Sequence, residues 1–245
     1  MHIPGRLWNN PLGEAAIVRM LGGLGLAPNQ TVLDVGCGNG EILARILERY
    51  SCNGVGIDPD PDEMAAARIR LAPLGPRARL LEGTVQDAEP KGPFDAAICI
   101  GSTHAFGGPG DVLEATLGAL APVVLPGGRL LIGEAHWRRP PDPDYLAATG
   151  IGVGDYVSHE DVIATAERAG WILLDAVTTP RADWDRFEGA ALAYVETLAA
   201  ASPDDPEAQA KADRSRAWRN AYENWGRETL GFGLYLFRNP DTSER

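Results

Sequence analysis

The stretch Val32-Leu33-Asp34-Val35-Gly36-Cys37-Gly38-Asn39-Gly40-Glu41 decides the fold of this chain. It begins as an apolar segment typical of a buried strand, breaks into alternate glycines and continues into a helix. Glycines after a strand let a ligand approach the backbone closely. A second short strand, residues 54–57, ends at Asp58, whose carboxylate can accept hydrogen bonds from both hydroxyls of a ribose. Together these features predict a site for a nucleoside-containing cofactor.

Predicted strands and helices alternate along the rest of the chain. Apolar segments predict strands at 31–35, 54–57, 78–82, 94–100, 129–132, 171–179 and 229–237. Segments with one apolar face predict helices at 12–25, 40–50, 61–72, 111–121 and 158–169. Such alternation is typical of an α/β fold with a doubly wound, mainly parallel seven-stranded sheet and right-handed crossovers.

Two segments interrupt this alternation within what we expect to be a single domain, residues 1–245. The connection 135–157 is rich in proline, glycine and aromatic residues, and its length indicates a functional role on the substrate side. Residues 181–228 carry aromatic side chains at helical spacing and a break at 202–206, which predicts a two-helix insertion before the last strand. Its aromatic side chains either dock the helices on the core or face a substrate pocket.

The composition of the chain indicates which partners and which cellular compartment to expect. The 245 residues carry a net charge of -12, which disfavours nucleic acid as a partner. Three cysteines without regular spacing indicate neither a disulfide framework nor a zinc site, and no other metal-ligand spacing is visible. Residues 1–11 contain no apolar core of signal-peptide length, and no apolar run approaches membrane-spanning length, so we expect a soluble, cytoplasmic protein without a membrane partner.

Four sequence motifs identify a family resemblance. They are VLDVGCGNGE from Val32, GID ending at Asp58, FDAAICIGS from Phe94 and LPGGRLLIGE from Leu125. Their order and spacing resemble the motif series of the class I S-adenosylmethionine-dependent methyltransferases over roughly residues 30–135. The resemblance implies a Rossmann-like methyltransferase fold with an antiparallel last strand. The C-terminal half resembles a bacterial small-molecule subgroup that is related in its core to quinone-biosynthesis methyltransferases.

The charges of the first motif agree with this cofactor. A dinucleotide site prefers G-x-G-x-x-G, because the helix N-terminus holds a pyrophosphate. Here Asp34 and Glu41 flank the glycines and would repel a pyrophosphate. S-adenosylmethionine has no phosphate and carries a positive sulfonium and ammonium, which nearby acids favour. A nicotinamide cofactor remains the alternative.

The resemblance also implies which residues contact S-adenosylmethionine and its product S-adenosylhomocysteine. Around the methionine end and the methyl donor it places Asp34, Gly36, Cys37, Gly38, Ile100 and Gly101. It places Asp58 at the ribose and Thr84, Val85 and Gln86 at the adenine. The segment Trp8–Leu12 resembles one that folds over the cofactor in related small-molecule methyltransferases, with Trp8 and Asn10 as its contacts. We therefore expect residues 1–25 to form an N-terminal lid and helix.

Methyl transfer needs a general base only where the nucleophile arrives protonated. The candidates follow the fourth and fifth strands, at the edge where open α/β sheets bind ligands, and they are His104, His136 and Glu134. We therefore expect a methyltransferase that acts on a small-molecule metabolite, as a monomer or homodimer. The alternatives are a non-catalytic S-adenosylmethionine-binding protein and an enzyme that methylates a macromolecule.

Overall fold

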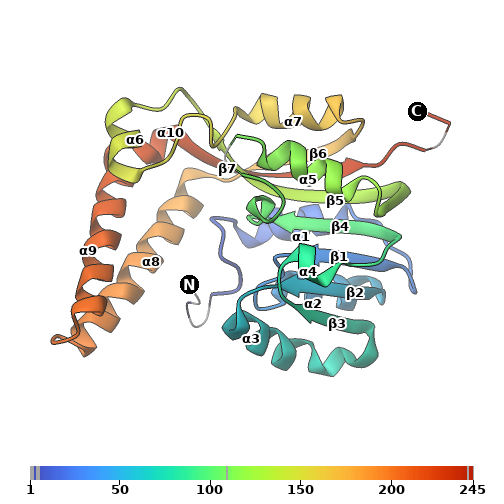
Figure 1. Ribbon diagram of the computed structural model, residues 1–245, viewed down its shortest axis with the longest axis horizontal. Coiled ribbons are helices and arrows are strands. Elements are labelled where there is room, and N and C mark those ends of the chain that lie inside the picture. Colours follow the sequence, from blue (N-terminus) through green and yellow to red (C-terminus); the bar gives the residue numbers. More distant parts are fainter. Residues whose placement is uncertain (1–2, 4–5, 109, 242, 245) are drawn as a thin grey trace.

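A seven-stranded sheet forms the centre of the molecule, in the strand order β3-β2-β1-β4-β5-β7-β6 (Figure 1). The computed structural model describes residues 3, 6–108, 110–241 and 243–244. The strands are β1 (Thr31–Val35), β2 (Asn53–Asp58), β3 (Ala78–Glu82), β4 (Phe94–Ile100), β5 (Val124–Trp137), β6 (Ile172–Thr178) and β7 (Leu230–Arg238). Strands β1 to β5 are parallel, whereas β7 runs antiparallel to both β5 and β6. The predicted fold class is confirmed.

Helices cover both faces of this sheet. One face packs against α1 (Glu14–Gly22), α2 (Glu41–Tyr50), α3 (Pro61–Leu71) and the start of α8 (Arg181–Ala201). The other face packs against α4 (Val85–Ala88), α5 (Val112–Leu120) and α7 (His159–Arg168). The central strands are therefore buried on both sides, which explains why Phe94–Ile100 is almost entirely apolar.

Strand β5 is longer than the sequence pattern predicts. The strand runs from Val124 to Trp137 instead of the predicted 129–132, so it begins earlier and ends later than expected. Its residues 129–137 pair continuously with β7, a segment about a hundred residues further along the chain. Residues 135–137, expected in the connection 135–157, are therefore strand, and α6 (Pro143–Thr149) follows within that connection.

A long helical hairpin lies between β6 and β7 and extends away from the sheet beyond its carboxyl edge (Figure 1). It consists of α8 and α9 (Pro206–Ala221), and a π-helical turn (Tyr222–Gly226) and α10 (Arg227–Thr229) lead back into β7. Trp184 stacks on Tyr222 with ring centroids 6.5 Å apart and also contacts Phe232 of β7. These aromatic side chains therefore dock the base of the hairpin on the core. None of the helices in the described ranges is long and apolar enough to cross a membrane.

Candidate functional site

A cavity of about 570 Å³ opens at the carboxyl ends of β1, β2 and β4. Its walls are the N-terminal segment, the loop after β1 and the end of β2, together with residues 83–84, the start of α4 and the short 3-10 helix η2 (Thr103–Ala105) after β4. All twelve residues that the resemblance assigns to the cofactor line this one cavity: Trp8, Asn10, Asp34, Gly36, Cys37, Gly38, Asp58, Thr84, Val85, Gln86, Ile100 and Gly101. The cavity lies at the edge of the sheet where parallel α/β folds bind their ligands.

The loop after β1 requires its glycines. Gly36 has φ +71°, and a Cβ there would lie 2.3 Å from the Cβ of Ser102. Gly38 and Gly40 also have positive φ angles, of +51° and +77°. The loop is tied to β2 because the amides of Gly36 and Cys37 both donate to the carbonyl of Ile57. The backbone is thus held in a shape that no side chain at Gly36 would allow.

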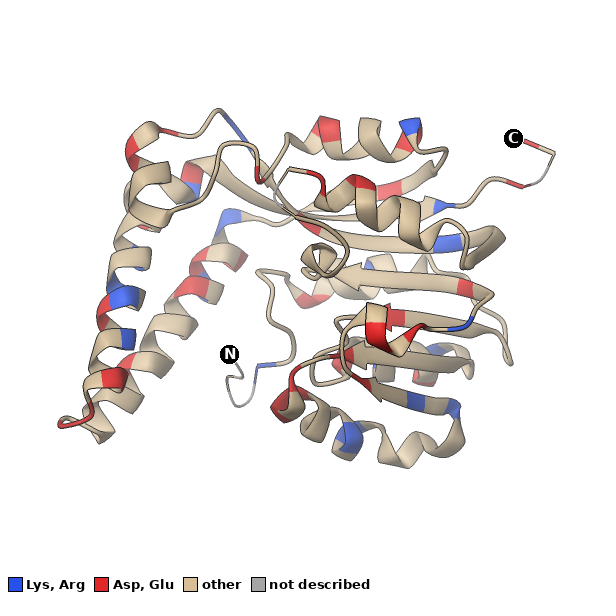
Figure 2. Cartoon of the chain, in the orientation of Figure 1, with Lys and Arg blue, Asp and Glu red and all other residues tan. Residues whose placement is uncertain are grey.

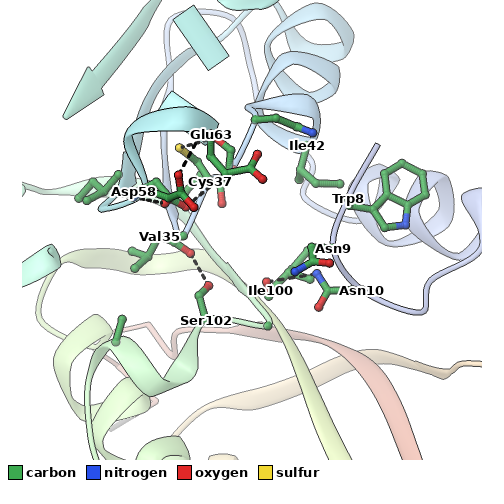
Figure 3. A pocket seen from close by; sticks show the side chains of 18 of the residues that line it. Trp8, Asn9, Asn10, Val35, Cys37, Ile42, Asp58, Glu63, Ile100 and Ser102 are labelled. Atoms are coloured by element: carbon green, nitrogen blue, oxygen red, sulfur yellow. Dashed lines mark hydrogen bonds between the residues drawn. The ribbon is translucent and has the colours of Figure 1, made fainter. Parts of the chain in front are cut away.

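Asp58 presents a fixed carboxylate to the cavity. Its Oδ2 accepts from the Gly38 amide at 2.8 Å, and its Oδ1 accepts from the Asp60 amide at 2.9 Å. Each carboxylate oxygen has a second lone pair, so the group can still accept from two hydroxyls. Figure 3 shows Asp58, Cys37 and Glu63 on one side of the cavity, and Trp8 and Asn10 on the other.

The carboxyl of Asp34 is buried, and its hydrogen bonding within the described part of the chain is incomplete. Its side chain is 3% exposed, and its Oδ2 has no hydrogen-bond partner among the described residues. Burial, and secondarily the nearby Asp58, raises the pKa of this carboxyl from 3.8 to about 7. A cationic ligand group would both pair the carboxylate and stabilise its charged form. By contrast, burial raises the pKa of the Cys37 thiol and so favours its protonated form.

The N-terminal segment closes one side of the cavity, and we call residues 6–12 the strap. The side chain of Asn10 donates from Nδ2 to the carbonyl of Ile100 at 3.5 Å, and a Cβ at Gly101 would lie 2.3 Å from Asn10 Oδ1. Trp8 donates from Nε1 to the Leu12 carbonyl, and the Arg45 guanidinium lies 5.2 Å from its ring centroid. The strap therefore touches the end of β4 directly.

Of the predicted catalytic residues, only His104 lines this cavity. It lies in η2, which is anchored to α4 because Gln86 Nε2 donates to the Ala105 carbonyl at 2.6 Å. The imidazole itself is exposed to solvent.

Glu134 and His136 point away from the cavity, because alternate side chains of β5 face the α5 and α7 side of the sheet. Glu134 is buried, accepts from Thr103 Oγ1 and from the Ala135 amide, and borders a separate cavity of about 60 Å³. His136 is buried against Tyr235, whose hydroxyl lies 3.3 Å from its Nδ1. Burial, with further contributions from His159 and Arg138, lowers the pKa of His136 to about 4.

Sequence reasoning missed several lining residues. Ser102 donates from Oγ to the Val35 carbonyl at 2.7 Å and so ties the loop after β4 to β1. Asn39 caps the Glu41 amide with its Oδ1 and holds the strap with its Nδ2, and Arg6 projects from the strap. The only signal in the sequence was their proximity to the recognised motifs.

Comparisons with known proteins agree with this geometry. A family model described as a methyltransferase domain matches residues 32–128. The structure of an S-adenosylmethionine-dependent methyltransferase from Geobacter sulfurreducens, in complex with S-adenosyl-L-homocysteine, superposes with a TM-score of 0.85 and 27% identity. That similarity covers 95% of this chain and 94% of the other. Residues 32–128 therefore form a methyltransferase domain. The chain as a whole resembles S-adenosylmethionine-dependent methyltransferases.

Other relatives are similar to this methyltransferase either at lower identity over nearly the whole chain or over only about half of it. The Escherichia coli protein YjhP is 28% identical over 232 residues, which span 93% of this chain and 92% of YjhP. The ribosomal protein L11 methyltransferase of Thermus thermophilus is 34% identical over 51% of this chain and 47% of its own. The ubiquinone biosynthesis O-methyltransferase of Cronobacter sakazakii is 32% identical over 49% of this chain and 47% of its own. The last two similarities extend over only about half of each protein.

The cofactor of the family, S-adenosylmethionine, fits the cavity of this methyltransferase. The unpartnered Oδ2 of Asp34 suits an ammonium, and the fixed carboxylate of Asp58 suits the ribose hydroxyls. The N-terminus of α2 carries Glu41, which is paired with Arg45 and Arg70. An acid at that helix end disfavours the pyrophosphate of a nicotinamide dinucleotide.

Proposed function

We propose that this methyltransferase transfers the methyl group of S-adenosylmethionine to a small-molecule acceptor. The observation that carries the proposal is the strap, which lies across the end of β4 beside Ile100 and Gly101. Arg6 joins the strap to α8 by donating from Nη2 to the Phe187 carbonyl at 3.0 Å. A small molecule can enter a space bounded in this way, whereas a folded macromolecule needs an open groove.

Methyl transfer requires little of the protein beyond the correct positioning of the cofactor and the acceptor. S-adenosylmethionine supplies a methyl group that its sulfonium has already activated. The protein has to align the acceptor nucleophile with that carbon and exclude water. The fixed Asp58 and the glycine loop hold the cofactor side, and the strap limits access of solvent.

His104 is the proposed general base for an acceptor that arrives protonated, because it alone of the three candidates lines the cavity. His104→Gln is expected to lower turnover at neutral pH and to leave the affinity for S-adenosylhomocysteine unchanged. Unchanged turnover would remove His104 from the reaction.

The charge distribution supports a small acceptor over a nucleic acid. The net charge is -12, and basic and acidic residues are interspersed along the ribbons of α8 and α9 (Figure 2). Arg216 pairs with Glu196 and Asp213, and Arg219 pairs with Glu223. These arginines are therefore already neutralised, and phosphate backbones meet no free basic stripe on these helices.

The test is transfer of label from methyl-labelled S-adenosylmethionine to separated fractions of a bacterial extract. The fractions are metabolites below about 1 kDa, total protein with added ribosomal protein L11, and tRNA. We expect label in the metabolite fraction only, and the Asp58→Ala variant is the catalytically impaired control. Label in protein or tRNA would refute the small-molecule assignment, and no label in any fraction would favour the non-catalytic alternative.

A further inference from the structure

The lining of the cavity has an uneven distribution of charge. Among the described lining residues, Arg6 is the only lysine or arginine. The same lining contains five carboxylates, and they are Asp34, Glu41, Asp58, Asp60 and Glu63. The amino-acid end of S-adenosylmethionine carries an ammonium, which suits these acids, and a carboxylate, which they would repel. The cofactor carboxylate therefore needs a positive partner within a largely acidic cavity.

Arg6 is attached to the part of the cavity that the glycine loop forms. Its carbonyl accepts from Asn39 Nδ2 at 3.2 Å, and Asn39 lies between Gly38 and Gly40. Further along the strap, Asn10 reaches the end of β4 at Ile100. These contacts hold the backbone of Arg6 beside the loop that carries Gly36 and leads from Asp34, where the methionine end is expected, and Arg6 lines the cavity.

The guanidinium of Arg6 retains capacity for a ligand. Its Nη1 donates to Asn9 Oδ1 at 2.9 Å and its Nη2 to the Phe187 carbonyl at 3.0 Å. A guanidinium has five N–H groups, so three remain without a hydrogen-bond partner among the described residues. The Cζ atom lies 4.3 Å from the Phe187 ring centroid, so the ring holds the guanidinium in place by a cation–π contact.

The charge of Arg6 is also poorly compensated. Burial lowers the pKa of Arg6, and among the described residues Glu188 is the carboxylate that acts against this effect. No ion pair joins Arg6 to any carboxylate that the structure describes. A half-buried cation without an ion-pair partner gains stability when an anion binds to it.

We propose that Arg6 binds the carboxylate of the cofactor's amino-acid end, opposite the acids that receive the ammonium. Because Phe187 belongs to α8, the same guanidinium links the bound cofactor to the helical hairpin. Cofactor binding then fixes the strap and the hairpin together before the acceptor enters. The inference concerns the cofactor alone and does not depend on the nature of the acceptor.

The test compares two ligands by calorimetry. S-adenosylhomocysteine carries the carboxylate, whereas its decarboxylated analogue, S-adenosyl-3-thiopropylamine, keeps the adenosine, the thioether and the amine. For Arg6→Gln we expect the affinity for S-adenosylhomocysteine to fall about 10-fold or more, and that for the analogue to change less than about twofold. Arg6→Lys should lie between Arg6→Gln and the wild type. The matched control is Arg186→Gln, since Arg186 is exposed on α8 and pairs with Asp183.

Equal losses for both ligands would mean that Arg6 acts only through the strap and would overturn the proposal. An unchanged affinity for S-adenosylhomocysteine in Arg6→Gln would overturn it as well. Thermal denaturation of each variant checks that it is folded. A wild-type protein that binds neither ligand would instead refute the cofactor assignment itself, so the two failures are distinguishable.

Discussion

Replacing Asp34 by asparagine should make the cofactor-free protein more stable and its cofactor binding weaker. The carboxyl is fully buried, and its pKa rises from 3.8 to about 7 on folding. The folded state therefore holds this proton more tightly than the unfolded chain does. Consequently the free energy of unfolding falls as the pH rises from 3.8 to about 7, by at most about 4 kcal/mol.

The Asp34→Asn variant lacks this titration. The free energy of unfolding of the variant minus that of the wild type should therefore be about 3 kcal/mol larger at pH 8 than at pH 5. Urea denaturation at both pH values measures this difference. Asp213→Asn, at an exposed residue of α9, is the control and should give no such difference. A constant difference between Asp34→Asn and the wild type at both pH values would refute the reasoning. Calorimetry should show the variant binding S-adenosylhomocysteine about 10-fold more weakly, since a charge-assisted hydrogen bond is lost.

Three further predictions follow from the site and its surroundings. Asp58→Ala should weaken binding of S-adenosylhomocysteine by more than about 1 kcal/mol in calorimetry, and an unchanged affinity would exclude Asp58 from the site. Gly36→Ala should destabilise the protein by about 1–3 kcal/mol in denaturant, because φ is +71° and the new Cβ meets Ser102. Adding Ser102→Gly should restore part of that loss, and no rescue would contradict the steric account. For His136, whose pKa falls to about 4 on folding, stability should be lost as the pH drops from 6.5 towards 4, by at most about 3 kcal/mol. His136→Gln should remove this part of the pH dependence, and a pH profile parallel to that of the wild type would contradict it.

The features that the sequence could predict depend on residues that lie close together along the chain. The strand at Thr31–Val35, the glycine loop and Asp58 lie within one β-α-β unit, so spacing alone identifies them. The prediction that twelve residues form one cofactor site stays a prediction, but all of them line one cavity. The family and its cofactor, which were inferred from the same motifs, are confirmed.

Contacts between distant segments explain the rest. The extension of β5 depends on its pairing with β7, and that extension decides which face of the sheet Glu134 and His136 occupy. Arg6 reaches Phe187 across 181 positions of sequence. No periodicity within either segment indicates such a contact, so Arg6 could be assigned a role only from the folded chain.

We expect this acidic cavity to bind the whole of the cofactor, with its ribose at Asp58 and its amino-acid end between Asp34 and Arg6. A crystal structure of the complex with S-adenosylhomocysteine tests it most directly. We expect the ribose hydroxyls within hydrogen-bond distance of Asp58, the ammonium at Asp34 and the carboxylate at Arg6. A ligand bound outside the cavity, or in it with its ribose away from Asp58, would contradict the account.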